Sequence, residues 1–429
     1  MKRAAVVIIL AILCTACASY IDLSSTEAYL RRGEYGQAYQ SLQQKSGHLI
    51  NAQGPLIASY DLGLLAHFNG DWSHSNELLS DADRRIQEAY TKSITANIAS
   101  LLINDNTIEY GGEEYESIYL NLFKALNYLH LNEEESALVE LRRLIEKQSL
   151  LQDAYEVQSQ ALTRYARANN IRAEAPLVQA TSFTTSALAN YLTAVVADAL
   201  NESSTAEYAI QQITHAFESQ PTLYPFPLPK NLVPSHQTDL VHLIALSGRS
   251  PIKQERTEYL GVSYDNYVKI AYPILIARPS AITTVRVRVD GKVATTLERI
   301  ESLSTVAAKT FEAKSELLYS KATMRAFSKA LGIGIWDATT TDEYGQQSLL
   351  GELVSLIFRV SREVSESADL RSTHFLPAQA WVGTIPITKA AHIIEFEYLN
   401  RSNSVIHTER FVRTFDPTKL TILESYSPL

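Results

Sequence analysis

Residues 197–221 read ADALNESSTAEYAIQQITHAFESQP, and this stretch decides the fold class of the first half of the chain. The residues that carry its pattern are Ala197, Leu200, Ala209, Ile213, Ala216 and the terminating Pro221. Small residues at these spacings let two helices cross closely, while larger apolar residues fill the groove between them. The stretch therefore predicts a helical hairpin of the tetratricopeptide type.

Earlier stretches repeat this pattern, at residues 33–38, 62–82 and 125–144. The small residues at the predicted helix crossings are Ala38, Ser75, Ala137 and Ala209, at intervals of 37, 62 and 72 residues. Only the first interval is close to the repeat length of about 34 residues, so we expect extra helices at residues 83–103 and 153–173. Residues 26–220 are predicted to form an irregular tetratricopeptide-like all-α superhelix with a concave protein-binding face, or else a generic helical bundle.

Residues 221–234 contain five of the fourteen prolines. Proline fixes φ and removes a backbone donor, which stops both helices and central strands. We expect residues 221–255 to be a Pro-rich connector and domain junction. Recognition of its prolines by a partner is the alternative.

Residues 256–429 are predicted to form an α+β domain with a small antiparallel sheet and two helices. The expected helices are residues 303–331 and 349–364. The expected strands, chosen for alternating or β-branched residues, are 268–273, 284–289, 292–295, 380–387, 391–398 and 405–415. Asp290-Gly291 is a hairpin turn signal between two of them.

The first seventeen residues have the pattern of an export signal. Lys2 and Arg3 precede an apolar run at residues 4–13, too short to span a membrane. The following Leu13-Cys14-Thr15-Ala16-Cys17 resembles a bacterial lipobox. That resemblance implies a signal peptide at residues 1–16, lipidation of Cys17 with palmitate or a similar acyl chain, and a lipid-anchored linker at 17–25. An ordinary cleaved signal is the alternative.

Several later segments are similar to one bacterial protein family. They are Tyr110-Gly111-Gly112-Glu113-Glu114-Tyr115-Glu116, Val139-Glu140-Leu141-Arg142-Arg143, Gly248-Arg249-Ser250-Pro251-Ile252-Lys253 and Ala368-Asp369-Leu370-Arg371-Ser372. They resemble an uncharacterised family of tetratricopeptide-repeat-containing envelope lipoproteins. The resemblance implies a periplasm-facing lipoprotein, and it implies no reaction. Ala18 and Ser19 follow Cys17 with no Asp directly after it, which resembles an outer-membrane address.

Composition excludes several classes of function. The 429 residues carry 38 Lys and Arg against 47 Asp and Glu, a net charge of −9, which argues against nucleic acid as a partner. Both cysteines, Cys14 and Cys17, lie in the export signal, so disulfides and cysteine-ligated metals are excluded from the processed chain. The sequence lacks GxSxG, HExxH, P-loop and EF-hand motifs, and we expect no cofactor and no metal.

Asp369, Arg371 and His374 form the first candidate site. Together with Ser372 they could supply a base, an anion clamp and a hydroxyl. A local pair between Asp369 and Arg371 is the structural alternative, and the one we favour.

Two further groups are candidates for interaction. The first joins Tyr110, Glu113, Glu114, Glu116 and Tyr115, expected to face Arg142 and Arg143 one helix later. It would bind a cationic ligand, or else be a solvated face with ion pairs between helices. The second joins Arg249 and Lys253, which could meet a phosphate or carboxylate or simply form a domain-junction turn.

These observations favour a non-enzymatic envelope lipoprotein that acts as a protein-interaction scaffold in envelope assembly or maintenance. Its expected partners are envelope proteins on the helical-repeat surface and the lipid bilayer through Cys17. An accessory or activator of peptidoglycan synthesis is a narrower version. An envelope hydrolase or ligand-binding protein that uses residues 369–374 is the competing class.

Overall fold

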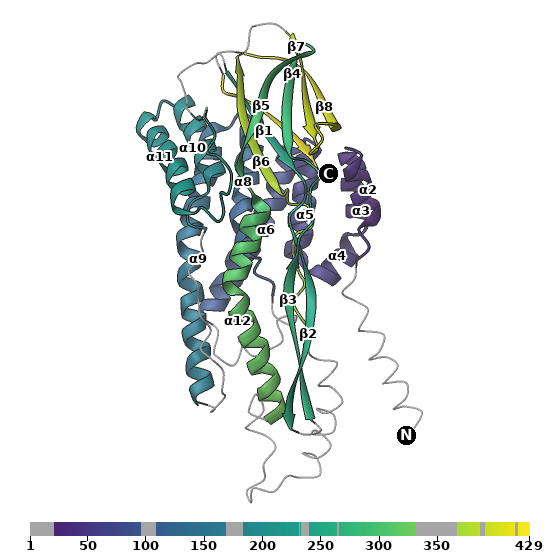
Figure 1. Cartoon of the computed structure of the whole chain (residues 1–429), viewed down its shortest axis with the longest axis vertical. Helices are drawn as coiled ribbons and strands as arrows, with labels where there is room; N and C mark the ends of the chain where they lie inside the picture. The colour runs from purple at the N-terminus through teal and green to yellow at the C-terminus, as the bar shows by residue number, and fades with distance from the viewer. Residues whose placement is uncertain are drawn as a thin grey trace, which may run out of the picture.

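A computed structural model describes residues 21–95, 109–168, 183–230, 232, 240–263, 266–331, 367–386, 391–416 and 419–429. Cys17 and the predicted signal peptide lie outside the described residues, as do the predicted helix at 349–364 and the ends of the helices predicted at 83–103 and 153–173. The described part is mixed α and β, with helices first and most strands later (Figure 1). None of its helices is long and apolar enough to span a bilayer.

Four helical hairpins occupy the first half. They are α2 (Ser24–Arg31) with α3 (Tyr35–Gln44), α5 (Pro55–Phe68) with α6 (Trp72–Thr95), α8 (Glu114–His130) with α9 (Glu134–Ala168), and α10 (Ala187–Ala199) with α11 (Ser203–Ser219). The short α4 (Ser46–Gln53) lies between the first two. The hairpins are those that the small-residue pattern predicts. The separate helices expected at 83–103 and 153–173 are wrong, because the described parts of these ranges continue α6 and α9.

The four hairpins share one turn. Its central residues have left-handed φ of 73°, 78°, 59° and 59° and are Gly33, Gly70, Asn132 and Asn201. An acidic residue follows each, and its N–H donates to the carbonyl five residues earlier at 2.7–3.0 Å. This is the Schellman bond, which satisfies a carbonyl at the helix end. Glycine and asparagine tolerate the left-handed conformation, so the turns follow from local sequence.

The shared turn corrects the predicted register of the last repeat. Four residues after the acidic residue stand Ala38, Ser75 and Ala137, and in the fourth hairpin Ala206 rather than Ala209. All of these residues are buried. Ala209 lies nearly one helical turn after Ala206 and is also small and buried. Residue spacing alone therefore did not show which of the two alanines occupies the repeat position.

The second half contains a seven-stranded sheet, larger than the small sheet predicted. Its order is β8-β7-β4-β5-β6-β1-β9, all antiparallel except β1 with β9. Its strands are β1 (Leu240–Ser247), β4 (Thr284–Val289), β5 (Lys292–Glu301), β6 (Gln379–Pro386), β7 (Ala391–Leu399), β8 (Val405–Thr414) and β9 (Thr421–Ser427). The connector predicted at 221–255 is wrong in its later part, because β1 is a buried strand between β6 and β9.

The sheet curls until its two edge strands nearly meet. Glu409 of β8 accepts hydrogen bonds from the Ser425 hydroxyl at 2.6 Å and the Tyr426 N–H at 3.1 Å, both on β9. Inward-facing residues such as Val287 and Phe396 fill the curl. The Glu409 side chain therefore accepts a hydrogen bond from the Tyr426 N–H of the edge strand β9. In a fully closed sheet, such an edge N–H would donate to the backbone of the neighbouring strand.

A long arm extends from one end of the sheet. It contains α12 (Leu303–Leu331), at the bounds predicted, and the hairpin β2 (Ile252–Ser263) with β3 (Asn266–Ile276); α9 runs to the same end (Figure 1). Val268 and Ile270 of β3 pack on Ala322 and Ala326 of α12.

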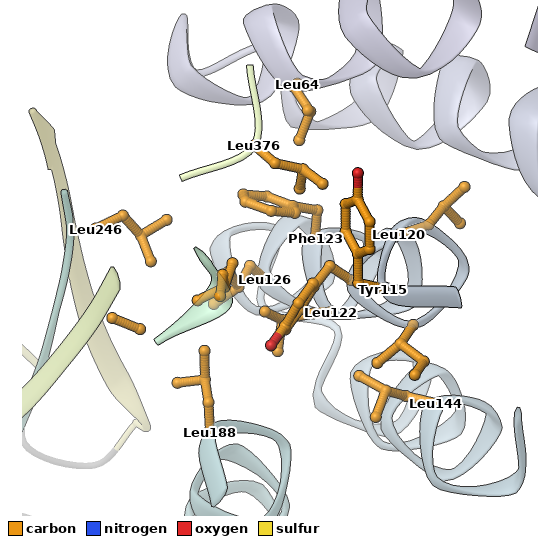
Figure 2. Close-up of a cluster of buried hydrophobic side chains, with 14 of the residues drawn as sticks. Leu64, Tyr115, Leu120, Leu122, Phe123, Leu126, Leu144, Leu188, Leu246 and Leu376 are labelled. Carbon is orange, nitrogen blue, oxygen red and sulfur yellow. The ribbon is translucent and has the colours of Figure 1, made fainter. Parts of the chain in front are cut away.

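The helices and the sheet share one hydrophobic core. Leu64, Phe123 and Leu188 from the helices contact the cluster that also contains Leu246 of β1 and Leu376 (Figure 2). The predicted division between residues 26–220 and 256–429 therefore separates two kinds of secondary structure and not two cores.

Candidate functional site

Three motifs that are distant in sequence meet at Tyr110, just before α8. Arg371 and Lys253 each place a cationic group 5.0 Å from the centre of the Tyr110 ring. Lys253 also pairs with Glu113, and Lys314 of α12 pairs with the second oxygen of Glu113. We call these residues, with Asp369, the Tyr110 cluster. It joins the helices to β2 and α12 through cation–π contacts and ion pairs.

Glu116 sits beneath the Tyr110 cluster and is fully buried. Its carboxylate accepts hydrogen bonds from the Tyr110 hydroxyl and the Glu113 N–H, each at 2.7 Å. It also accepts from the Thr373 N–H at 2.6 Å and hydroxyl at 3.1 Å. Burial raises the pKa of Glu116, and the nearby Lys253 and these donors oppose that rise. The carboxylate is saturated with donors and ties α8 to residues 372–374.

The first candidate group does not converge on a common point. Arg371 occupies both carboxylate oxygens of Asp369, at 2.8 and 2.9 Å, as the favoured structural alternative predicts. His374 instead contacts Asp61 of α5, with its Nδ1 2.6 Å and its backbone N–H 2.9 Å from that carboxylate. Asp369 and Arg371 therefore pair with each other, while His374 belongs to a separate pair with Asp61.

The expected pairing of the acidic group with Arg142 and Arg143 is wrong. Arg142 contacts Glu202 at 2.9 Å and Arg143 contacts Glu140 at 2.8 Å. The alternative of a solvated acidic face is also wrong, because Glu113, Glu114 and Glu116 are buried. In the second group, Arg249 lies 2.7 Å from Glu27.

Glu114 is the one member of its group without a charged neighbour acting on it. It is 6% exposed, and its Oε1 has no hydrogen-bond partner within the described structure. Burial raises the pKa of Glu114 to about 8. At neutral pH the folded protein therefore holds this carboxyl mostly in its protonated form.

Replacing Glu114 by glutamine should stabilise the protein at alkaline pH. The folded state binds this proton more tightly than the unfolded chain, so the unfolding free energy falls as pH rises from about 4.5 to 8. Glu114→Gln removes that fall and should add about 2–3 kcal/mol at pH 8 and little at pH 5. Urea unfolding at the two pH values measures it. The exposed first-turn Glu135→Gln is the control, and an unchanged pH slope in Glu114→Gln would contradict the assignment.

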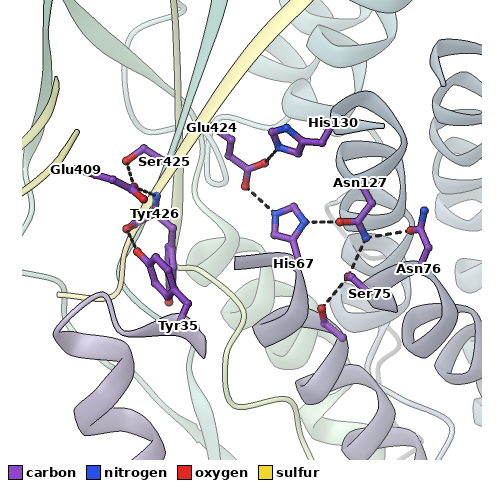
Figure 3. A network of polar contacts seen from close by, with 11 residues as sticks. Tyr35, His67, Ser75, Asn76, Asn127, His130, Glu409, Glu424, Ser425 and Tyr426 are labelled. Carbon is purple, nitrogen blue, oxygen red and sulfur yellow. Dashed lines mark hydrogen bonds and ion pairs between the residues drawn. The ribbon is translucent and has the colours of Figure 1, made fainter. Parts of the chain in front are cut away.

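A polar network between the helices and β9 has no counterpart among the predicted sites (Figure 3). Glu424 of β9 lies between two histidines, 2.9 Å from Nε2 of His67 on α5 and 2.9 Å from Nε2 of His130 on α8. His67 Nδ1 lies 2.7 Å from Asn127 Oδ1. We call these four residues the His67–Glu424 network.

Hydrogen bonding in this network defines the protonation of His67. The Ser75 hydroxyl donates to the Gly63 carbonyl, so it must accept from Asn127 Nδ2 at 2.8 Å. Asn127 therefore turns its oxygen towards His67, whose Nδ1 must donate. With Glu424 ionised, Nε2 donates as well, so His67 is an imidazolium. Burial alone would lower the pKa of His67, but Glu424 and the hydrogen bonds raise it overall.

Glu301, at the end of β5, forms a third buried junction. Its carboxylate accepts from the hydroxyls of Tyr119 at 2.7 Å, Ser186 at 2.8 Å and Tyr224 at 3.1 Å. The Leu188 N–H at the start of α10 donates at 3.1 Å. A carboxylate at a helix N-terminus is stabilised by the free N–H groups there. Glu301 thus connects the sheet to α8 and α10.

One sequence signal could have located these junctions. His67 and Asp61 interrupt the otherwise apolar α5, and Asn121 and Asn127 interrupt α8, yet all four are buried. Polar residues inside an apolar helix predict buried hydrogen-bond partners. They do not identify those partners, which lie up to 357 residues away.

The described residues include no group of three or more His, Cys, Asp or Glu side chains arranged to hold a metal. Glu116, Glu301 and Glu424 use their oxygens in internal hydrogen bonds. Such saturated carboxylates hold elements together rather than accept a proton from a substrate. Comparisons with protein-family models, curated proteins and solved structures found no match to this chain.

Proposed function

We propose that this protein is a non-enzymatic scaffold of the bacterial cell envelope, anchored by lipid at Cys17 and facing the periplasm. One observation carries the scaffold proposal: the buried carboxylates Glu116, Glu301 and Glu424 each join a helical hairpin to the sheet or to residues 372–374. A rigid frame that presents several surfaces is what a positioning protein requires. The lipobox-like residues 13–17 support the anchor.

The geometry argues against the competing hydrolase proposal. Asp369 is neutralised by Arg371 and is held below its usual pKa, with burial opposed chiefly by the hydrogen bond from Arg371. A general base needs a free lone pair and a pKa near the working pH. Asp369 has neither.

In-cell photocrosslinking tests the scaffold proposal. Exposed aromatic or apolar side chains mark suitable positions on three different elements: Tyr208 of α11 (62% exposed), Tyr259 of β2 (58%) and Val412 of β8 (62%). We expect a photoreactive residue at one or more of these positions to capture a defined envelope protein. Exposed Glu312 of α12 is the control position.

The anchor is tested separately from the scaffold. A palmitate analogue should label the wild-type chain and leave Cys17→Ala unlabelled. Labelling that persists in Cys17→Ala would contradict the anchor. Absence of any specific crosslink from the lipidated wild-type background at all three positions would contradict the scaffold.

A further inference from the structure

Two arginines, Arg249, which is buried, and Arg278, which is half-buried, converge on one carboxylate of α2. Arg249, in the turn between β1 and β2, places Nη1 2.7 Å from Glu27 Oε1. Arg278, after β3, places its own Nη1 3.9 Å from the same oxygen. The remaining bonds of Arg278 go to neutral groups, the carbonyls of Ser250 at 2.6 Å and His374 at 2.7 Å. Two guanidinium groups therefore face the same oxygen of Glu27, and the carboxylate of Asp61 also acts on Arg278.

Three buried polar groups in this region are not fully satisfied by hydrogen bonds within the described structure. Although Arg249 Nη1 is close to Glu27, it has no properly directed hydrogen bond, and the adjacent Ser250 hydroxyl has no partner within the described structure. Among the residues that the structure describes, the Tyr115 hydroxyl also lacks a hydrogen-bond partner, and Arg278 is near enough to act on the pKa of Tyr115. Arg249, Ser250 and Tyr115 are at least nine-tenths buried. Buried donors without acceptors are costly unless a ligand satisfies them.

Access to the arginine pair is on the side of Glu27. Its side chain is 29% exposed, against 9% for Arg249 and 15% for Arg278. Of the three side chains, that of Glu27 is therefore the one that solvent reaches most. The burial of the donors limits a ligand to a small group rather than a folded surface.

We propose that Arg249, Arg278 and Ser250 form a binding site for a small oxyanion, a carboxylate or phosphate group, and that Glu27 occupies the site in its absence. The paired N–H donors of a guanidinium group bind carboxylates and phosphates through charge-assisted hydrogen bonds. A ligand oxygen would take the place of Glu27 Oε1, and further oxygens would accept from Arg249 Nη1 and the Ser250 hydroxyl. This site depends neither on the lipid anchor nor on a scaffold role.

Glu27→Gln tests the proposal because it removes the competing negative charge and keeps the side-chain size. Calorimetric titration with inorganic phosphate and with acetate, against sodium chloride at matched ionic strength, should show saturable binding at least about tenfold tighter than in the wild type. The better of the two anions identifies the ligand group. Glu34→Gln, which breaks the exposed Arg32–Glu34 pair of the same hairpin, should leave affinity unchanged.

The donors are tested in the Glu27→Gln background. Arg278→Gln should abolish saturable binding, and Ser250→Ala, which removes a hydroxyl without a partner, should weaken it several-fold while the protein stays folded. If Arg278→Gln does not fold, Ser250→Ala decides the matter. Equal affinity in Glu27→Gln and Glu34→Gln, no binding of either anion, or full affinity in Ser250→Ala would overturn the proposal.

Discussion

Glu301→Ala should lower the unfolding free energy by about 4 kcal/mol, the larger of the two main stability effects that we expect. The substitution leaves the hydroxyls of Tyr119 and Ser186 and the Leu188 N–H without their acceptor in a buried site. It also creates a cavity, which adds to the loss. Urea unfolding followed by circular dichroism measures the change.

Two variants keep this prediction testable if Glu301→Ala does not fold. Tyr119→Phe removes one donor to Glu301 and should cost about 1 kcal/mol. Glu298→Ala, on the same strand, loses only an exposed bond from the Lys230 N–H and should cost less than about 1 kcal/mol. Equal effects of Glu301→Ala and Glu298→Ala would show that Glu301 is not a junction.

Glu424→Gln should destabilise the protein by about 3 kcal/mol near pH 5.5 and by less than about 1 kcal/mol near pH 9. The pKa of Glu424 is lowered, because His67 and His130 outweigh its burial, so its contribution is present above about 4.5. The pKa of His67 is raised, so its contribution is complete below about 6.5 and is lost as pH rises through the folded-state value. The ion pair is therefore strongest between these limits.

The amide introduced by Glu424→Gln suits a neutral His67. Its NH₂ can donate to the deprotonated Nε2 of His67, while its oxygen accepts from His130 Nε2. At low pH the same NH₂ faces a protonated Nε2, which leaves two donors opposed. Glu424 in turn acts on Glu409 of β8 and Tyr35 of α3, whose pKa values are raised chiefly by burial.

An exposed pair provides the matched control for the His67–Glu424 network. His74 and Glu77 on α6 are 3.2 Å apart, and the Glu77 side chain is 77% exposed. Glu77→Gln should change stability little at any pH, because water screens exposed pairs. A destabilisation by Glu424→Gln that is equal at pH 5.5 and pH 9 would contradict an imidazolium at His67.

Local patterns predicted much of the secondary structure. The range of α12 matches at both ends, β4 matches residues 284–289, and the four hairpins appear where small residues recur. The strands β1, β2 and β9 were not predicted. Five consecutive residues of β1 are buried, at 243–247, so the strand lacks the alternation that marks a half-buried strand. In β9, Glu424 lies among apolar residues, and this segment resembles a polar C-terminal tail more than a strand.

The sequence identified the candidate residues more successfully than the contacts between them. Tyr110, Glu113, Lys253, Asp369 and Arg371 were singled out in three separate motifs, and the structure brings them together at Tyr110. Sequence spacing relates residues on one helix or strand, but it contains no information on which distant segments touch. The neighbours expected for the acidic group were therefore the nearest arginines in sequence, Arg142 and Arg143, and these were wrong.

The sequence by itself determined the turns, helices and alternating strands, because backbone preference and apolar periodicity act over a few residues. Only the tertiary structure decided that Glu116 meets Thr373, that Glu301 meets α10 and that His67 meets Glu424. Each of these carboxylates is polar in sequence and would be placed on the surface by its chemistry alone. They are buried because the shared core brings donors from distant segments to them, and a buried charge is stable only where such donors converge.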